Sequence, residues 1–176
     1  STAGTAQGPQ GHQQYRGLAV DGSGRAWASG GIVTYNGAAT AVEHISTDAL
    51  SGPDPNAQQK DNMLAVGHNA LTGAHEVATV VGNQCGYSRS YGVAHDTVNG
   101  ITYGGGRASE HMLTLAGAHQ LAFVGDGNVN ALYGEQCAYI MALDSDTGVV
   151  LHASYFGVAT DGDFFRDVIY HNGYVY

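Results

Sequence analysis

Basic residues are scarce in this sequence. It has 6 lysines and arginines against 15 aspartates and glutamates, which gives a formal net charge of −9, and Lys60 is its only lysine. A surface with this charge repels phosphate groups, so we expect no binding to nucleic acid. Long hydrophobic runs are also lacking. Because no stretch of about 18 apolar residues occurs, we expect no helical membrane span.

The common signatures of catalysis are missing too. The sequence contains no Gly-x-Ser-x-Gly element, no phosphate-binding loop and no Rossmann fingerprint. Its nine histidines include no His-Glu-x-x-His motif, the close spacing that zinc enzymes use. The sequence therefore assigns no catalytic residue and no cofactor, and it favours a protein that is not an enzyme.

Glycine is abundant, with 27 residues set among short β-forming runs, and this favours an all-β fold. The stretch Gly92–Gly106 predicts two strands joined by a tight turn at Asn99-Gly100, since both residue types tolerate a positive φ. The same sequence pattern occurs at Gly17–Gly31, and it begins again at Asp167–Tyr176.

These copies predict a repeat with a period of 75 residues. At this spacing Gly17 aligns with Gly92, Asp21 with Asp96, and Gly30-Gly31 with Gly105-Gly106. A second segment, residues 71–82, aligns with residues 146–157. His44 aligns with His119, which suggests a structural role for these two histidines. We divide the chain into a lead-in loop (1–16), a first unit (17–91), a second unit (92–166) and the start of a third (167–176).

Each complete unit is expected to hold four strands with a long insertion between the second and third. The first unit has predicted hairpins at residues 17–30 and 62–82, and the second has them at 92–105 and 137–157. Residues 40–45 in the first insertion read as an accessory strand or a short helix. Residues 108–121 in the second read as a helix or a strand pair, because periodicity does not decide between them.

Four antiparallel strands per unit is the blade of a β-propeller. The run Ala138–Gly157, followed by a polar stretch and Asp167–Tyr176, resembles the β-propeller repeats of bacterial secreted and cell-surface proteins. The turn from Leu143 to Gly148 is also similar to pyrroloquinoline-quinone-type propeller repeats. The resemblance implies about two and a half blades in an extracellular or surface protein, and it covers the core strands but not the insertions.

A closed propeller has four to eight blades, so two and a half do not make a ring. We expect the ring to be completed by further parts of a longer chain. The alternative is that half-blades pair between subunits. The function that we favour is a non-enzymatic scaffold for protein–protein assembly, such as an extracellular filament. A carbohydrate-binding propeller (a lectin or adhesin) is the second hypothesis, and a quinoprotein-like or glycan-cleaving propeller enzyme is the third.

The two cysteines, Cys85 and Cys137, are too few to define a framework. In the predicted blade both lie toward the same face of the second unit, which favours a disulfide and an oxidising compartment. The alternative is a pair of small buried apolar side chains.

Two weaker predictions concern ligands. Asp161, Asp163 and Asp167 form the densest acidic cluster, a weak calcium candidate in which Phe164 and Phe165 interrupt the series, and an ordinary Asp/Gly turn is the favoured alternative. His95 and His171 end the first strands of successive units and are candidates to face a central channel, where polar lining is favoured over a shared metal or ligand.

Overall fold

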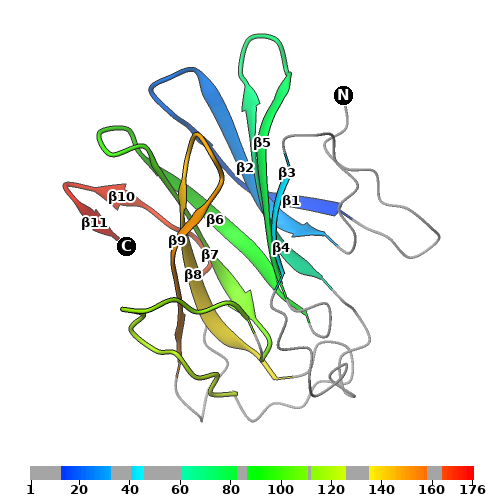
Figure 1. Ribbon diagram of the computed structural model, residues 1–176, viewed down its shortest axis with the longest axis vertical. Coiled ribbons are helices and arrows are strands. Elements are labelled where there is room, and N and C mark those ends of the chain that lie inside the picture. Colours follow the sequence, from blue (N-terminus) through cyan, green and yellow to red (C-terminus); the bar gives the residue numbers. More distant parts are fainter. Residues whose placement is uncertain are drawn as a thin grey trace.

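The computed structural model describes residues 13–32, 41–45, 61–82, 87–110, 112–125, 135–157 and 164–176 (Figure 1). All regular elements in these ranges are β-strands, so the all-β prediction is confirmed. The strands are β1 (Gln13–Val20), β2 (Arg25–Ile32), β3 (Ala41–Ile45), β4 (Asn62–Asn69), β5 (His75–Gly82), β6 (Arg89–Asp96), β7 (Ile101–Ala108), β8 (Cys137–Asp144), β9 (Val150–Phe156), β10 (Tyr170–His171) and β11 (Tyr174–Val175).

The strands form two main sheets and one short hairpin. The first sheet has the order β1-β2-β4-β5-β3, the second has the order β6-β7-β8-β9, and β10 pairs with β11. Within each main sheet the four predicted strands pair antiparallel in sequence order, which confirms that part of the prediction. The segment read as an accessory strand or helix is a strand, β3, and it runs parallel to β5.

The two sheets carry matching irregularities 75 positions apart. The β1–β2 register shifts between Tyr15 and Gly17, and the β6–β7 register shifts between Ser90 and Gly92. The same spacing relates the shift at Gly67/His68 to the shift at Ala142/Leu143. Such bulges bend a strand at a fixed point, so the two sheets share local shape as well as strand order. The division into units at residues 17, 92 and 167 stays a prediction.

One part of the predicted alignment is wrong by one residue. The turn between β1 and β2 spans residues 22–24, whereas the turn between β6 and β7 spans residues 97–100. Because the second turn is longer, β7 follows β2 at a spacing of 76, and Gly30 corresponds to Gly106 rather than to Gly105. Both glycines have backbone where a Cβ would lie: the Gln14 carbonyl oxygen at Gly30 and the Arg89 carbonyl oxygen at Gly106.

The predicted tight turn at Asn99-Gly100 also differs from the structure. Gly100 has a positive φ of 65°, but Asn99 does not, and the loop holds four residues. A two-residue Asn-Gly turn occurs instead at Asn172 (φ 50°) and Gly173 (φ 84°), between β10 and β11. Both residues there adopt the left-handed conformation that this kind of turn requires.

The second insertion is neither a helix nor a strand pair in its described part. Residues 109, 110 and 112–125 follow an irregular path, drawn at the foot of the second sheet in Figure 1. Tyrosines of the sheet bind this path: the Tyr155 hydroxyl accepts from Met112 N at 2.7 Å and donates to Ser109 O at 2.9 Å. Tyr139 donates to the Leu113 carbonyl. These contacts replace the backbone pairing that regular structure would provide.

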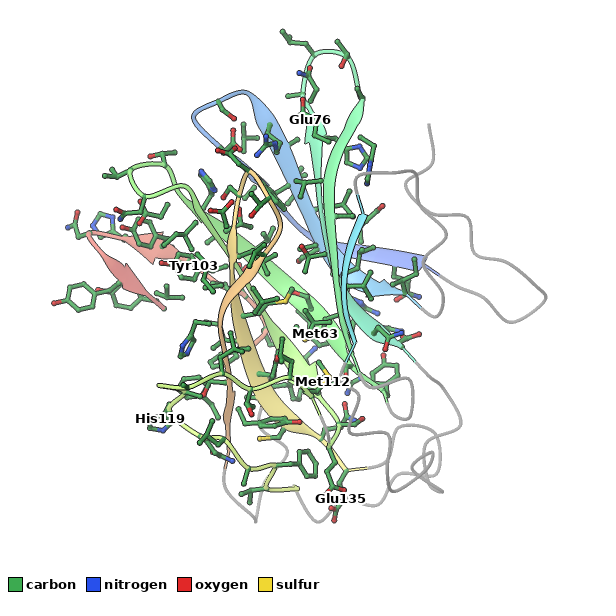
Figure 2. All side chains as sticks on the ribbon, in the orientation of Figure 1. Met63, Glu76, Tyr103, Met112, His119 and Glu135 are labelled. Carbon is green, nitrogen blue, oxygen red and sulfur yellow. The ribbon has the colours of Figure 1, made fainter. Side chains whose placement is uncertain are left out.

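The main core lies between the two sheets, where side chains of both are fully buried. Figure 2 shows Met63 in this layer. The larger members include Trp27, Met63, Val77 and Val81 from the first sheet and Tyr139, Met141, Leu143 and Tyr155 from the second. A smaller cluster of Ile32, Leu64, Val66, Ala78 and Val80 lies on the opposite face of the first sheet.

The first strands of successive units approach closely at glycine. A Cβ at Gly17 would lie 2.9 Å from Val93 N, and a Cβ at Gly92 would lie 2.4 Å from Val168 N. Both distances are shorter than a carbon atom tolerates. The absence of a side chain at these two equivalent positions therefore allows β1, β6 and the segment before β10 to lie side by side.

Candidate functional site

An apolar groove of about 580 Å³ lies between the second sheet and the C-terminal segment. It is lined on the sheet side by β7, β8 and β9 and on the other side by residues around the β10–β11 hairpin. Its main apolar lining consists of Ile101, Tyr103, Ile140, Leu151, Phe156, Phe165, Val168, Val175 and Tyr176. Figure 2 shows Tyr103 on the side of the sheet next to β10.

The alternation of side chains along β8 creates this surface. Tyr139, Met141 and Leu143 point into the core shared with the first sheet. Because successive residues of a strand face opposite sides, Ala138 and Ile140 face away from that core, toward the groove. The second sheet is therefore apolar on both faces, which is the pattern of a strand layer packed between two others.

The groove face corresponds to a face that is buried in the first sheet. Trp27, Ala65 and Val77 lie at or below 2% exposure against the second sheet. Their positional equivalents, Tyr103, Ile140 and His152, are only partly buried. The same face of the repeat is thus covered in one sheet and open in the next.

The C-terminal segment covers part of this open face. Phe165 N donates to Gly106 O at 3.2 Å, and the rings of Tyr103 and Tyr170 stack with centroids 5.7 Å apart. Val168 is buried, while Tyr174 and Tyr176 remain exposed. In the described part of the chain only β10 pairs with β11, so the outer edge of β11 carries unpaired strand backbone.

A second, smaller groove adjoins the first. It measures about 390 Å³ and is lined by His119, Gln120, Ala138, Phe156, Gly157, Phe164 and Phe165. His119 stacks on Phe156 with centroids 4.8 Å apart. The backbone of His44 pairs with Val81, whose equivalent is Phe156, so the two aligned histidines lie at corresponding edges of their sheets.

The turns of the two sheets are joined by a polar network rather than by a ligand site. Arg25 Nε donates to Glu76 at 2.7 Å, and its Nη1 donates to the Ser145 carbonyl. Trp27 Nε1 donates to Asp21 at 3.2 Å. Burial would raise the pKa of Asp21, but hydrogen bonds from Ser23, the Arg25 backbone and Trp27 outweigh it and lower that pKa.

The predicted histidine pair is not brought together among the described residues. His95 Nδ1 lies 3.1 Å from Thr102 Oγ1 and 3.3 Å from Ser145 Oγ, inside the turn network, and burial lowers its pKa. His171 is exposed at the β10 turn. Tyr170, and not His171, occupies the position 75 residues after His95.

The cysteine and calcium predictions lie partly outside the described residues. Cys137 is buried at the start of β8, where its Sγ donates to Phe156 O at 3.3 Å, but Cys85 is not described. Asp161 and Asp163 are not described either, and Asp167 is exposed. Among the residues that the structure does describe, no three His, Cys, Asp or Glu side chains gather as a metal site would require. The disulfide and the calcium site therefore stay predictions.

The groove was not among the sites predicted from the sequence. The repeat alignment held a signal for it: the residues that line the groove are equivalent to buried residues one unit earlier. The equivalent pairs are Trp27 and Tyr103, Ala65 and Ile140, and Val77 and His152.

None of the described segments forms a helix that is long and apolar enough to cross a membrane. No protein-family model and no curated protein matches this sequence.

Proposed function

We propose that this chain is a segment of a β-propeller that acts as a non-enzymatic scaffold for protein–protein assembly in a secreted or surface structure. The observation that supports it most is the open apolar face of the second sheet. The equivalent positions of the first sheet are buried. Fully burying one large apolar side chain contributes about 1.5–3 kcal/mol, so an open face of this kind favours association.

The partner that we propose is a further sheet of the same repeat. The contact between the two sheets offers the template: Val93 of β6 is buried against the first sheet, while its equivalent in β1, Leu18, is 74% exposed. A sheet presenting an apolar face like that of β6–β9 would cover the groove, and its strands would extend the edge of β11. Adding strands at an exposed edge supplies main-chain hydrogen bonds as well as apolar burial.

A photo-crosslinking residue at the groove tests this proposal. We would replace Leu151, which is 49% exposed at the groove, and separately Leu71, which lies in the exposed β4–β5 turn away from it. Each variant is expressed in the native producer and irradiated, and the joined peptides are sequenced by mass spectrometry. We expect the position 151 variant to join a β-strand peptide of the same repeat type, from this polypeptide or another copy, and the position 71 variant not to.

The joined mass identifies the source of the strand. A crosslink that leaves the polypeptide mass unchanged places the strand in the same chain, and one that adds a chain places it in a partner. Crosslinks only to lipid or glycan, or equal yields at positions 151 and 71, would overturn the proposal.

A further inference from the structure

Arginine and aromatic side chains form a cluster around the beginning of β6 and the end of β7, next to the smaller groove that Phe164 lines. Arg16, Tyr91 and Arg166 are spaced 75 residues apart, which is the predicted repeat period. The guanidinium carbon of Arg16 lies 5.1 Å from the centre of the Tyr91 ring. The guanidinium of Arg166 lies 4.2 Å from the centre of Phe164, whose ring is 6.0 Å from that of Tyr91.

Arg107, at the end of β7, lies near all three aromatic rings of this group. Its guanidinium lies 5.6 Å from the Tyr91 ring, 5.8 Å from the Phe164 ring and 4.6 Å from the Tyr87 ring. Arg89 lies on Tyr87 as well, also at 4.6 Å. Four of the five arginines of the chain therefore gather around three aromatic rings, a grouping that we call the arginine cluster.

The charges within the arginine cluster are unevenly compensated. Arg89 is buried and forms an ion pair with buried Asp61, and it also donates to Gln14 Oε1 at 2.9 Å. Arg16 and Arg166 are exposed, and neither has an ion pair among the described residues. Arg16 and Arg166 thus place two exposed guanidinium groups on a chain whose formal net charge is −9.

Guanidinium groups stacked on aromatic rings retain their binding capacity. The ring contacts the flat face of the guanidinium, while the N–H donors point outward in its plane. Those donors match the oxygens of a carboxylate, sulfate or phosphate, and charge-assisted hydrogen bonds of this type are the stronger ones in proteins. The rings also hold like charges together, which lowers the cost of arranging them around one anion.

We propose that the arginine cluster is a binding site for an oxyanion group, with the exposed Arg16 and Arg166 as the donors. Arg89, held by Asp61 and Gln14, positions the Tyr87 ring beneath Arg107. The ligand class is a small inorganic oxyanion or a carboxylate carried on an acidic sugar. The site shares Phe164 with the smaller groove, but anion binding by its arginines does not rest on the proposed assembly role.

Binding by calorimetry at low ionic strength tests the site. The probes are sulfate, phosphate and an oligogalacturonate, with a neutral galactose oligomer of equal length as the control. We would compare the unaltered chain with the double variant R16Q/R166Q, which removes two exposed guanidinium groups, and with R16K/R166K, which keeps the charges but removes the planar donors. Circular dichroism and melting temperature establish that each variant is folded.

We expect at least one anionic probe to bind the unaltered chain and the neutral oligomer not to bind. The affinity should fall about tenfold or more in R16Q/R166Q and by a smaller factor in R16K/R166K, because a point charge replaces a planar fork. Binding of sulfate or phosphate alone would assign a free inorganic anion, and binding of the oligogalacturonate alone would assign an acidic sugar. No binding by any anion, or binding that R16Q/R166Q leaves unchanged, would overturn the proposal and leave the cluster a packing contact between units.

Discussion

The guanidinium of Arg25 in the first sheet donates a hydrogen bond to the carbonyl of Ser145 in the second. The same side chain pairs with Glu76 in its own sheet, so a single residue joins the turns of both sheets. Most of the described interface between the sheets is apolar.

Replacing Arg25 should therefore weaken the fold. For Arg25→Gln we expect the free energy of unfolding to fall by about 1–3 kcal/mol, because the buried Ser145 carbonyl and the partly exposed Glu76 carboxylate lose a charged donor. Urea denaturation measures the change. The matched control is Asp146→Asn, whose side chain is 91% exposed, and we expect it to stay within about 0.5 kcal/mol of the unaltered chain. Equal effects of both substitutions would show that the Ser145 contact contributes nothing.

Adding a methyl group at Gly92 should separate neighbouring units. The Cβ of Gly92→Ala would lie 2.4 Å from Val168 N and 2.6 Å from Asp167 C, and both atoms belong to backbone that cannot rotate away. We expect a loss of about 1–3 kcal/mol, typical of overpacking, with faster amide exchange at Val168. Thr97→Ala, in the exposed β6–β7 turn, is the control for a small surface change. Unchanged exchange at Val168 in Gly92→Ala would contradict the packing described.

Acid should destabilise the chain through Asp96. Burial acts to raise the pKa of this carboxyl, but hydrogen bonds from Asn99, Tyr170 and the Val98 backbone outweigh it and lower the pKa to about 2 from 3.8. A pKa that is lower in the folded state adds stability above the unfolded value, and that stability is lost as the pH falls from about 4 to about 2. Melting temperature across this range measures the loss.

The Asp96→Asn variant should show a shallower fall in melting temperature over the same pH window. Asp167→Asn removes an exposed carboxylate and the same formal charge, so it serves as the control. If the Asp96→Asn and unaltered profiles have the same slope, Asp96 does not carry the acid sensitivity.

Removing the Tyr155 hydroxyl should release the irregular segment that follows β7. In Tyr155→Phe, Met112 N and Ser109 O lose their buried partner, and we expect a loss of about 1–3 kcal/mol. Hydrogen exchange should accelerate at Met112 more than within β8 or β9. Tyr176→Phe, at an exposed ring, should change neither quantity. Protection at Met112 that survives Tyr155→Phe would contradict this role.

The strands and turns could be predicted because the turns use residues with narrow conformational preferences. Asp21 and Asp96 each accept two backbone N–H groups of their own turn, and Gly73 and Gly148 share a positive φ. The one-residue error in β7 arose in the turn itself, where one added residue changes the spacing without disturbing the strands.

The groove and the arginine cluster could not be predicted in the same way. Whether Tyr103 is covered depends on what packs against the second sheet, which no local pattern encodes. Arg16, Tyr91 and Arg166 share the repeat spacing but differ in residue type, so a comparison that counts identities passes over them. Contacts between unlike residues at one repeat position become visible only when the units are placed side by side.

The third member of the Gly17–Gly92 series is Asp167, which has a side chain where the first two units have none. Asp167 is exposed, and its side chain occupies space that glycine leaves open at the other two positions. The missing side chains at Gly17 and Gly92 therefore decide how near β1, β6 and the segment before β10 come to one another.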